Sequence, residues 1–168
     1  MKRVLVIGSG GAGKTTFSMA LAAKTGLPLI HLDRLFWKPG WVETPKAEWK
    51  ATIRDVIARD RWILDGNYGG TLPERLEACD TVVFFDFPRL VCLRQVLIRR
   101  LQHLGRGHVE IAEECPERLT WSFVVWIWTY PSTRRAGILE RLDNLRPDQR
   151  AVVLRSRSDA RRFLETLG

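Results

Sequence analysis

The clearest chemical pattern in the chain lies directly after its first apolar segment. There the sequence matches GxxxxGK[ST], in which glycines let the backbone curl so that its N–H groups face an anion at the start of a helix. In such a loop the lysine reaches the terminal phosphates of a nucleotide, and the last hydroxyl binds Mg²⁺. We therefore expect ATP and Mg²⁺ to bind at this loop and at the residue after it. These residues are Gly8, Ser9, Gly10, Gly11, Ala12, Gly13, Lys14, Thr15 and Thr16.

The elements that flank this loop decide between a phosphate site and a glycine turn that merely precedes Lys-Thr. A β-branched apolar run over residues 3–7 predicts a buried strand, and the spacing of apolar residues over 13–24 predicts a helix. Because the loop joins a strand to a helix, the phosphate site is favoured.

Aspartates follow three of the predicted strands, where a parallel sheet binds its ligands. Asp33 is expected to orient an acceptor hydroxyl, accept its proton or hold a Mg²⁺-bound water, the alternative being a cap of a helix or turn. Asp65 and Asp86 are alternatives for the metal role, although Asp65 also fits a simple turn and Asp86 a strand end. The predicted Mg²⁺ site consists of Thr15, Asp33 and Asp65.

Strands alternate with helices along the whole chain. Further strands are predicted at 27–32, 62–64, 81–85 and 151–154, and further helices at 45–59, 89–104, 116–130, 132–145 and 158–167, with a break at Pro131. This alternation predicts an α/β fold in which helices cover both faces of a five-stranded parallel sheet. The length of 168 residues is that of one domain, so we expect a single domain over 1–168.

The composition points to an anionic partner. The chain has 27 Lys and Arg against 19 Asp and Glu, a net charge of +8, and its 45% hydrophobic residues exclude a disordered chain. Nucleic acid, a membrane surface or a phosphorylated small molecule would each satisfy this charge. Three widely spaced cysteines favour a reducing, cytoplasmic location, and the longest apolar stretch, near 121–130, is too short to span a bilayer.

Four segments together resemble the adenylate-kinase-like P-loop kinases. They are the GxxxxGK[ST] loop, HLDRLFWKPGW (31–41), WILDGNY (62–68) and DFPR (86–89). The similarity covers nearly the whole chain and is closest to the subgroup of DNA topology modulation proteins. It implies a three-layer P-loop fold with sheet order 2-3-1-4-5, an acceptor-binding region at about 33–60 and a helical lid at about 99–118. It also implies Mg²⁺-dependent phosphoryl transfer from ATP, with the adenine near Arg155.

The resemblance has one departure in the acceptor site. Adenylate kinases place an arginine after the Asp-Gly of the third strand to hold the AMP phosphate, whereas this chain continues with Asn67 and Tyr68. Arg75 is the candidate substitute, and Arg54 is a second candidate unless it lies on a solvated helix face. Trp37, Trp41 and Tyr68 either stack on a nucleobase or, for the tryptophans, pack the loop onto the helix that contains Trp49. The predicted acceptor site comprises Asp33, Trp37, Trp41, Arg54, Asp65, Gly66, Asn67, Tyr68 and Arg75.

Arginines gather around the predicted lid. Five of them and no acid lie between Arg89 and Arg106. Arginines in such a lid neutralise the charge of the transferring phosphoryl group, although a single arginine can equally be a surface charge. The predicted catalytic residues are Lys14, Asp33, Arg99, Arg106 and Arg134.

The sequence therefore predicts a cytoplasmic kinase that phosphorylates a small acceptor: a nucleoside, a nucleotide or a related metabolite. Two alternatives stay open, namely a nucleic-acid-associated ATPase that affects DNA topology and a nucleotide-binding regulatory module without transfer activity. No membrane partner is expected. The apolar stripe at Trp121, Val124, Val125 and Trp128 fits either core packing or a dimer contact, so both a monomer and a homodimer are compatible with the sequence.

Overall fold

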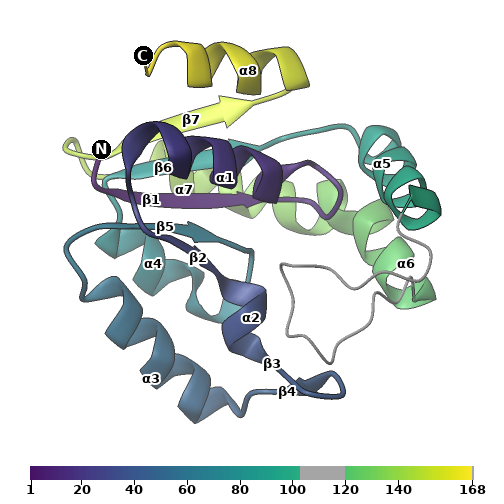
Figure 1. Ribbon diagram of the computed structural model, residues 1–168, viewed down its shortest axis with the longest axis horizontal. Coiled ribbons are helices and arrows are strands. Elements are labelled where there is room, and N and C mark those ends of the chain that lie inside the picture. The colour runs from purple at the N-terminus through teal and green to yellow at the C-terminus, as the bar shows by residue number, and fades with distance from the viewer. Residues whose placement is uncertain (103–119, 168) are drawn as a thin grey trace.

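A parallel sheet forms the centre of the computed structural model, which describes residues 1–102 and 120–167 (Figure 1). Its strand order is β2-β5-β1-β6-β7, and every neighbouring pair is parallel. Counted in chain order these five strands run 2-3-1-4-5, which confirms the predicted order. The strands are β1 (Arg3–Gly8), β2 (Leu29–His31), β5 (Trp62–Asp65), β6 (Thr81–Phe85) and β7 (Arg150–Leu154).

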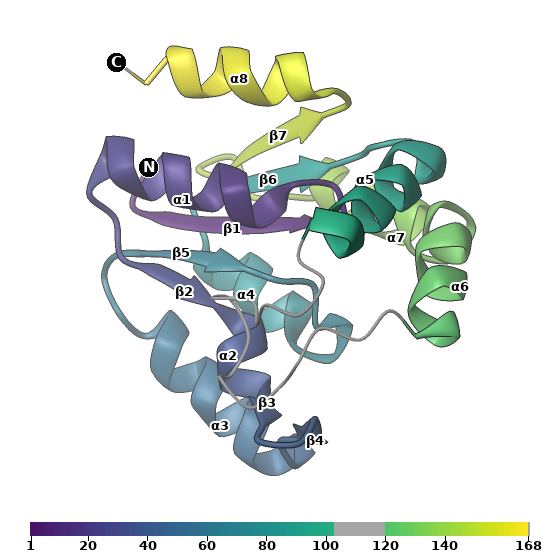
Figure 2. The ribbon, with the colours of Figure 1, turned by 45° about the vertical axis from the view of Figure 1, so that its right-hand side comes forward.

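Helices cover both faces of the sheet, as Figures 1 and 2 show, because the central strands are apolar on both sides. On β1, Val4 and Val6 pack toward one set of helices, whereas Leu5 and Ile7 pack toward the other. All four side chains are at most 1% exposed. The first set is α1 (Lys14–Thr25), α5 (Arg89–Gln102) and α8 (Arg157–Glu165), and the second is α3 (Lys46–Ile57), α4 (Leu72–Ala78) and α7 (Ala136–Asp143).

The sequence pattern does not predict several short elements of the structure. Their few residues leave no room for a recognisable hydrophobic period. They are the helix α2 (Leu32–Phe36), the antiparallel pair β3 (Trp37–Lys38) and β4 (Val42–Glu43), the 3₁₀ turn η1 (Gly69–Thr71) and the helix α4.

The predicted break at Pro131 is wrong. α6 (Trp121–Tyr130) continues through the π-helical turn η2 (Pro131–Arg135) directly into α7. Proline has no N–H to donate, so the helix widens here rather than ends. Within this turn the Thr129 carbonyl accepts hydrogen bonds from the hydroxyls of Ser132 and Thr133, each at 2.9 Å.

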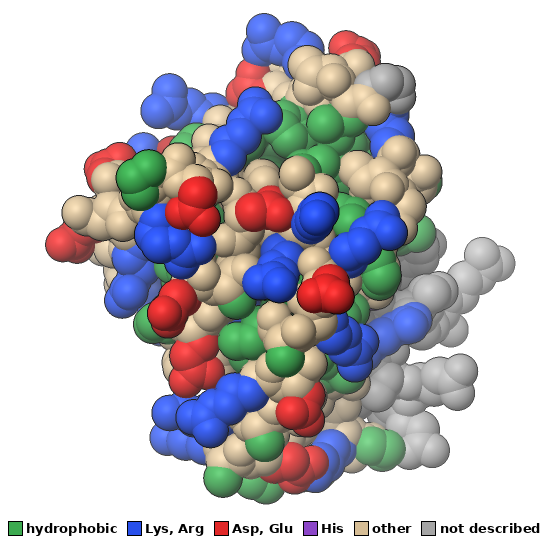
Figure 3. Space-filling model, turned by 90° about the vertical axis from the view of Figure 1, so that its left-hand side faces the viewer, with side chains coloured by type: hydrophobic (Ala, Val, Ile, Leu, Met, Phe, Trp, Pro, Cys, Tyr) green, Lys and Arg blue, Asp and Glu red, His purple; other side chains and the backbone are tan. Residues whose placement is uncertain are grey.

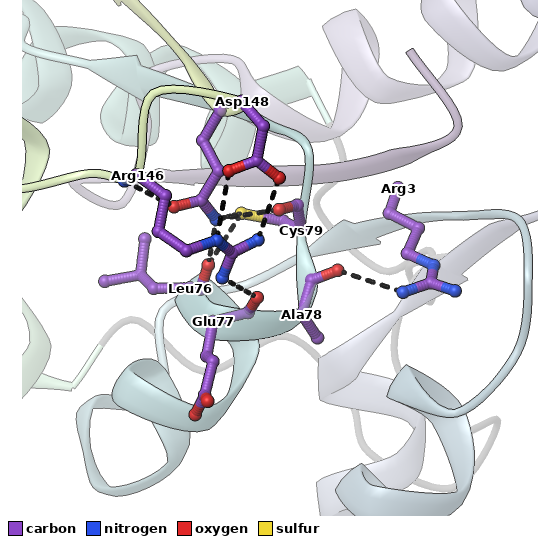
Figure 4. A network of polar contacts seen from close by, with 8 residues as sticks. Arg3, Leu76, Glu77, Ala78, Cys79, Arg146 and Asp148 are labelled. Atoms are coloured by element: carbon purple, nitrogen blue, oxygen red, sulfur yellow. Dashed lines mark hydrogen bonds and ion pairs between the residues drawn. The ribbon is translucent and has the colours of Figure 1, made fainter.

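The end of α4 is tied to the loop that precedes β7 (Figure 4). Gln149 Nε2 donates to the carbonyls of Leu76 and Cys79 at 2.6 and 2.7 Å, and Arg146 donates to that of Glu77 at 2.7 Å. The last carbonyls of a helix have no partner within it, so these side chains satisfy groups that would otherwise face water. α4 is thereby held in register with the sheet.

We predict that Gln149→Ala lowers the stability of the fold. Two partly buried carbonyls lose their donor, which costs about 1–2 kcal/mol and lowers Tm by about 2–8 °C for a chain of this size. Asp148→Ala is the matched control, because it removes only an exposed ion pair with Arg146. Thermal unfolding followed by circular dichroism measures both variants, and an equal Tm loss in the two would contradict the prediction.

Candidate functional site

The loop between β1 and α1, residues 8–15 and called the P-loop from here on, turns into α1 through glycines with a positive φ. Gly13 caps α1 in a left-handed conformation (φ 87°) and makes no side-chain cap to the first turn of that helix. Gly11 also has a positive φ of 75°. Lys14 Nζ lies 3.0 Å from the carbonyl of Ser9. The first N–H groups of a helix have no partner within it, so this helix start, together with one cation, fits the phosphates of a nucleotide.

Close packing against the outside of the P-loop makes its glycines necessary. A Cβ on Gly10 would lie 2.6 Å from the ring of Phe123 on α6, and one on Gly11 would lie 2.3 Å from the Cys92 carbonyl of α5. A side chain at Gly11 would therefore displace the backbone of α5, and one at Gly10 would displace the Phe123 ring. The first turns of α5 and α6 therefore set the shape of the phosphate cradle.

Asn67 fixes the start of the P-loop. Its Nδ2 donates to the Gly8 carbonyl at 2.7 Å, and its Oδ1 accepts from the Gly8 N–H at 3.0 Å. The amide thus pairs with one backbone residue in the way that a neighbouring strand would. Both polar atoms of Asn67 are engaged with Gly8, so Asn67 supports the P-loop, and its predicted contact to an acceptor stays a prediction.

Asp33 lies on α2, beyond the carboxyl end of β2, and is held by Tyr68. The Tyr68 hydroxyl donates to Asp33 Oδ1 and is also hydrogen-bonded to the Trp37 side chain. Although part of the Asp33 surface is open to water, desolvation by neighbouring atoms raises the pKa of its carboxyl above the ordinary value. The hydrogen bond from Tyr68 and the charge of Lys14 act in the opposite direction. The carboxylate therefore lies within electrostatic reach of the P-loop lysine.

Asp65 lies beside Asp33 and pairs with a histidine that the sequence reasoning did not select. Asp65 is 6% exposed, and its Oδ2 lies 3.2 Å from His31 Nδ1, its register partner on β2. The signal in the sequence was that His31 lies only two residues before Asp33, at the end of the same predicted strand. The charge of Asp65 raises the pKa of Asp33, so the two carboxylates repel each other.

The predicted Mg²⁺ site has a donor set that suits the ion. Thr15 supplies a hydroxyl in the first turn of α1, and Asp33 and Asp65 supply carboxylates, which are the hard oxygen ligands that Mg²⁺ takes. Within 1–102 and 120–167, no group of three His, Cys, Asp and Glu side chains forms a metal site on its own. Phosphate oxygens and water would have to complete the coordination, as is usual for this ion.

Asp86 and Arg75 are both engaged elsewhere. Asp86 accepts two hydrogen bonds from Arg135, at 2.7 and 2.9 Å, which leaves Asp65 as the better metal candidate. The guanidinium of Arg75 is 0% exposed and donates to the carbonyls of Gly66 and Tyr68 at 3.0 and 2.8 Å. An acceptor phosphate has no access to it, so the expectation that Arg75 replaces the phosphate-binding arginine of adenylate kinases is not supported by its environment.

The remaining arginines have different positions relative to the site. Arg134, on η2, reaches the loop that follows β5, where a Cβ on Gly69 would lie 3.6 Å from its Nη1. Arg54 is exposed on α3, and Arg155 is exposed directly after β7. Arg99 lies in the last turn of α5, whereas Arg106 and most of the predicted lid at 99–118 lie outside the described residues.

The aromatic residues of the acceptor region pack on one another. Trp37 contacts both Trp41 and Phe36, with ring centroids 5.2 and 5.0 Å apart. Phe36 in turn lies 5.2 Å from Trp49 and 4.6 Å from Tyr68. This arrangement matches the packing alternative of the sequence analysis, in which the tryptophans join the loop to α3. Both tryptophans keep partly exposed surfaces.

Known structures share this fold. A shikimate kinase from Acinetobacter baumannii in complex with shikimate aligns with a TM-score of 0.65 at 15% identity, covering 99% of this chain and 90% of its own. A shikimate kinase from Bacteroides thetaiotaomicron aligns with a TM-score of 0.58 at 19% identity, covering 99% and 95%. The chain therefore has the fold of the P-loop kinases. At these identities the likeness establishes the fold and leaves the substrate open.

Sequence comparisons add one partial match. A family model described as isopentenyl transferase matches residues 1–40, which contain the P-loop and the residues up to Gly40. This is less than half of the chain and does not assign it to that family. No match was found among curated proteins. The adenylate-kinase-like and topology-modulation resemblance stays a prediction from the sequence.

We predict that Tyr68→Phe raises the pKa of Asp33 further. The hydroxyl stabilises the charged carboxylate, so its removal favours the protonated form and moves the titration to higher pH. Carboxyl ¹³C shifts followed by NMR against pH measure this directly. An unchanged or lower Asp33 pKa would show that the hydroxyl does not stabilise the carboxylate.

Proposed function

We propose that this protein is a Mg²⁺- and ATP-dependent phosphotransferase that acts on a hydroxyl group of a small acceptor. The observation that carries the proposal is the Asp33 carboxylate, held by Tyr68 within electrostatic reach of the P-loop lysine. Phosphoryl transfer depends mainly on positioning and charge neutralisation, and this arrangement supplies a residue for each task.

The P-loop side of the site would hold the phosphate donor. Free N–H groups at the start of α1 and the Lys14 ammonium neutralise phosphate charge, and Thr15 with Asp65 would hold Mg²⁺. Bound Mg²⁺ supplies charge neutralisation on the phosphate oxygens. Within residues 1–102 and 120–167, Lys14 hydrogen-bonds to the Ser9 carbonyl at 3.0 Å, a neutral partner that it can exchange for an anion at small cost.

The acceptor side favours a hydroxyl over a phosphate. A carboxylate such as Asp33 repels a phosphate but accepts the proton of a hydroxyl or orients it. The buried Arg75 offers no cation to a nucleoside monophosphate, whereas Arg134 beside Gly69 is placed to bind one anionic group. We therefore favour nucleosides and small hydroxyl-bearing metabolites with one anionic group over nucleotides. The similar shikimate kinase that was solved with shikimate supports an acceptor of this size.

The charge distribution gives the nucleic-acid alternative no added support. On the face shown in Figure 3, Lys and Arg side chains alternate with Asp and Glu rather than forming one basic surface. A phosphate backbone binds best to a continuous basic stripe.

None of the described helices combines the length and apolarity needed to cross a bilayer.

We predict that the purified protein with Mg²⁺ and ATP phosphorylates a hydroxyl of at least one acceptor from a panel of nucleosides, sugars and small hydroxy acids. Asp33→Asn lowers kcat by about 10²–10⁴-fold, because it removes the proton acceptor. Lys14→Ala lowers kcat by about 10²–10³-fold through lost charge stabilisation. Formation of ADP and ³¹P NMR of the product measure both effects.

Two exposed residues of α3 provide matched controls. Asp55→Asn and Lys50→Ala make the same chemical changes away from the site and should leave kcat unchanged. ATP hydrolysis that needs no acceptor, is stimulated by DNA and survives Asp33→Asn would contradict the proposal. Binding of ATP without turnover on any member of the panel would favour the regulatory module instead.

We predict that Arg134→Ala weakens the acceptor more than the nucleotide. Loss of one charge-assisted hydrogen bond raises the acceptor KM by about 10–100-fold, while the KM for MgATP stays within a factor of three of wild type. Arg141→Ala, exposed in the last turn of α7, is the control. Steady-state kinetics with each substrate varied in turn separate the two values, and a larger rise in the KM for MgATP would move Arg134 to the nucleotide side.

A further inference from the structure

Arg75 is a buried cation whose partners are backbone atoms. Its guanidinium is 0% exposed and donates from Nε to the Thr71 carbonyl at 3.3 Å and from Nη1 to Gly66 at 3.0 Å. Nη2 donates to the carbonyls of Asn67 and Tyr68. Among the described residues, the hydrogen bonds of this side chain all go to the loop at residues 66–71. One side chain therefore fixes the whole β5–α4 loop.

Placing a guanidinium here is costly for the fold. Burial lowers the pKa of Arg75 to about 10, so the side chain is charged at neutral pH and loses its hydration on folding. An apolar residue of similar volume would avoid that cost but would leave four carbonyls without their donor. The planar guanidinium is well suited to holding these carbonyls in one geometry.

The loop that Arg75 holds contacts both the P-loop and the Asp33 carboxylate, which are the phosphate-donor side and the acceptor side of the proposed reaction. Asn67 pairs with the backbone of Gly8, the first residue of the P-loop. The next residue, Tyr68, donates to the Asp33 carboxylate. Two adjacent residues therefore set the phosphate-donor loop and the acceptor carboxylate relative to each other.

Tyr68 adopts a backbone conformation that needs outside support. Its φ of 38° and ψ of 70° lie in the left-handed region, which a non-glycine residue adopts only when its surroundings enforce it. Arg75 holds the Tyr68 carbonyl at 2.8 Å, and it also holds the carbonyls of Gly66 and Thr71 on the two sides of Tyr68 in the sequence. In this conformation the side chain of Tyr68 reaches Asp33.

We infer that Arg75 is a positioning residue that aligns the P-loop with the acceptor carboxylate through Asn67 and Tyr68. The inference rests on the proposed phosphotransferase function. Arg75 touches neither reactant and acts only through the loop at residues 66–71. A displacement of about 1 Å between reacting groups lowers a rate by about 100-fold, so a loosened loop should affect turnover far more than binding.

The test compares Arg75→Lys with Arg146→Lys. Lysine keeps the charge but not the planar set of donors, so it cannot hold four carbonyls at once. Arg146 supports the opposite end of α4 through Glu77 (Figure 4), so its variant loosens the same helix away from the loop. We expect Arg75→Lys to lower kcat about 100-fold with a change of less than threefold in the Kd for MgATP, and Arg146→Lys to leave kcat unchanged.

A second measurement does not depend on activity. The Gly8 N–H donates to Asn67 Oδ1, so the hydrogen-exchange rate of this amide reports whether the loop at residues 66–71 still binds the P-loop. We expect faster exchange of this amide in Arg75→Lys, by tenfold or more, and a wild-type rate in Arg146→Lys. If the wild-type protein phosphorylates no acceptor, the proposed function fails while the exchange of Gly8 still tests the positioning role.

The inference is overturned if Arg75→Lys lowers Tm but keeps wild-type kcat and wild-type exchange at Gly8. It is also overturned if kcat falls equally in Arg75→Lys and Arg146→Lys, since general loosening of α4 would then explain both. Arg75→Met tests whether the buried charge itself stabilises the fold. If that variant does not fold, Arg75→Lys still decides the question.

Discussion

The pair of hydrogen bonds between Asn67 and Gly8 is the contact on which the rest of the site depends. It joins the end of β5 to the start of the P-loop at a point where the strand ladder between β1 and β5 has already ended. Without it, the P-loop would lose its direct link to the loop that carries Tyr68. With it, the phosphate cradle and the Asp33–Tyr68 pair belong to one rigid unit, because Tyr68 follows Asn67 directly.

The rest of the molecule makes this contact possible by keeping the polar side chains of the central strands at the strand ends. The central strands are buried on both faces, so charged side chains cannot emerge from the middle of a strand without losing their hydration. His31, Asp65 and Asp86 accordingly come at the last strand residue or just after it. The same constraint explains why Asp86 pairs with Arg135 and Asp65 with His31, since each partly buried carboxylate there needs a donor.

The helices complete the site from outside the sheet. α5 and α6 press on Gly10 and Gly11 and so shape the P-loop from behind, whereas η2 directs Arg134 to Gly69 and Arg135 to Asp86. The π-helical turn at Pro131 has a functional consequence here, because it places two consecutive arginines toward two different strand ends.

The sequence by itself determined the five strands of the central sheet and the phosphate loop, whereas the strand order was expected only from the resemblance to a known family. Both the strands and the loop depend on local patterns: buried parallel strands appear as short apolar runs, and the P-loop needs fixed glycine spacing followed by Lys14 and Thr15. Asp33 and Tyr68 also came out of local motifs. Only the tertiary structure decided what Arg75, Asn67 and Asp86 do, because the role of a polar side chain depends on partners distant in sequence and on its burial. Arg75 was expected to meet a phosphate, and folding instead surrounds it with carbonyls that leave a ligand no access.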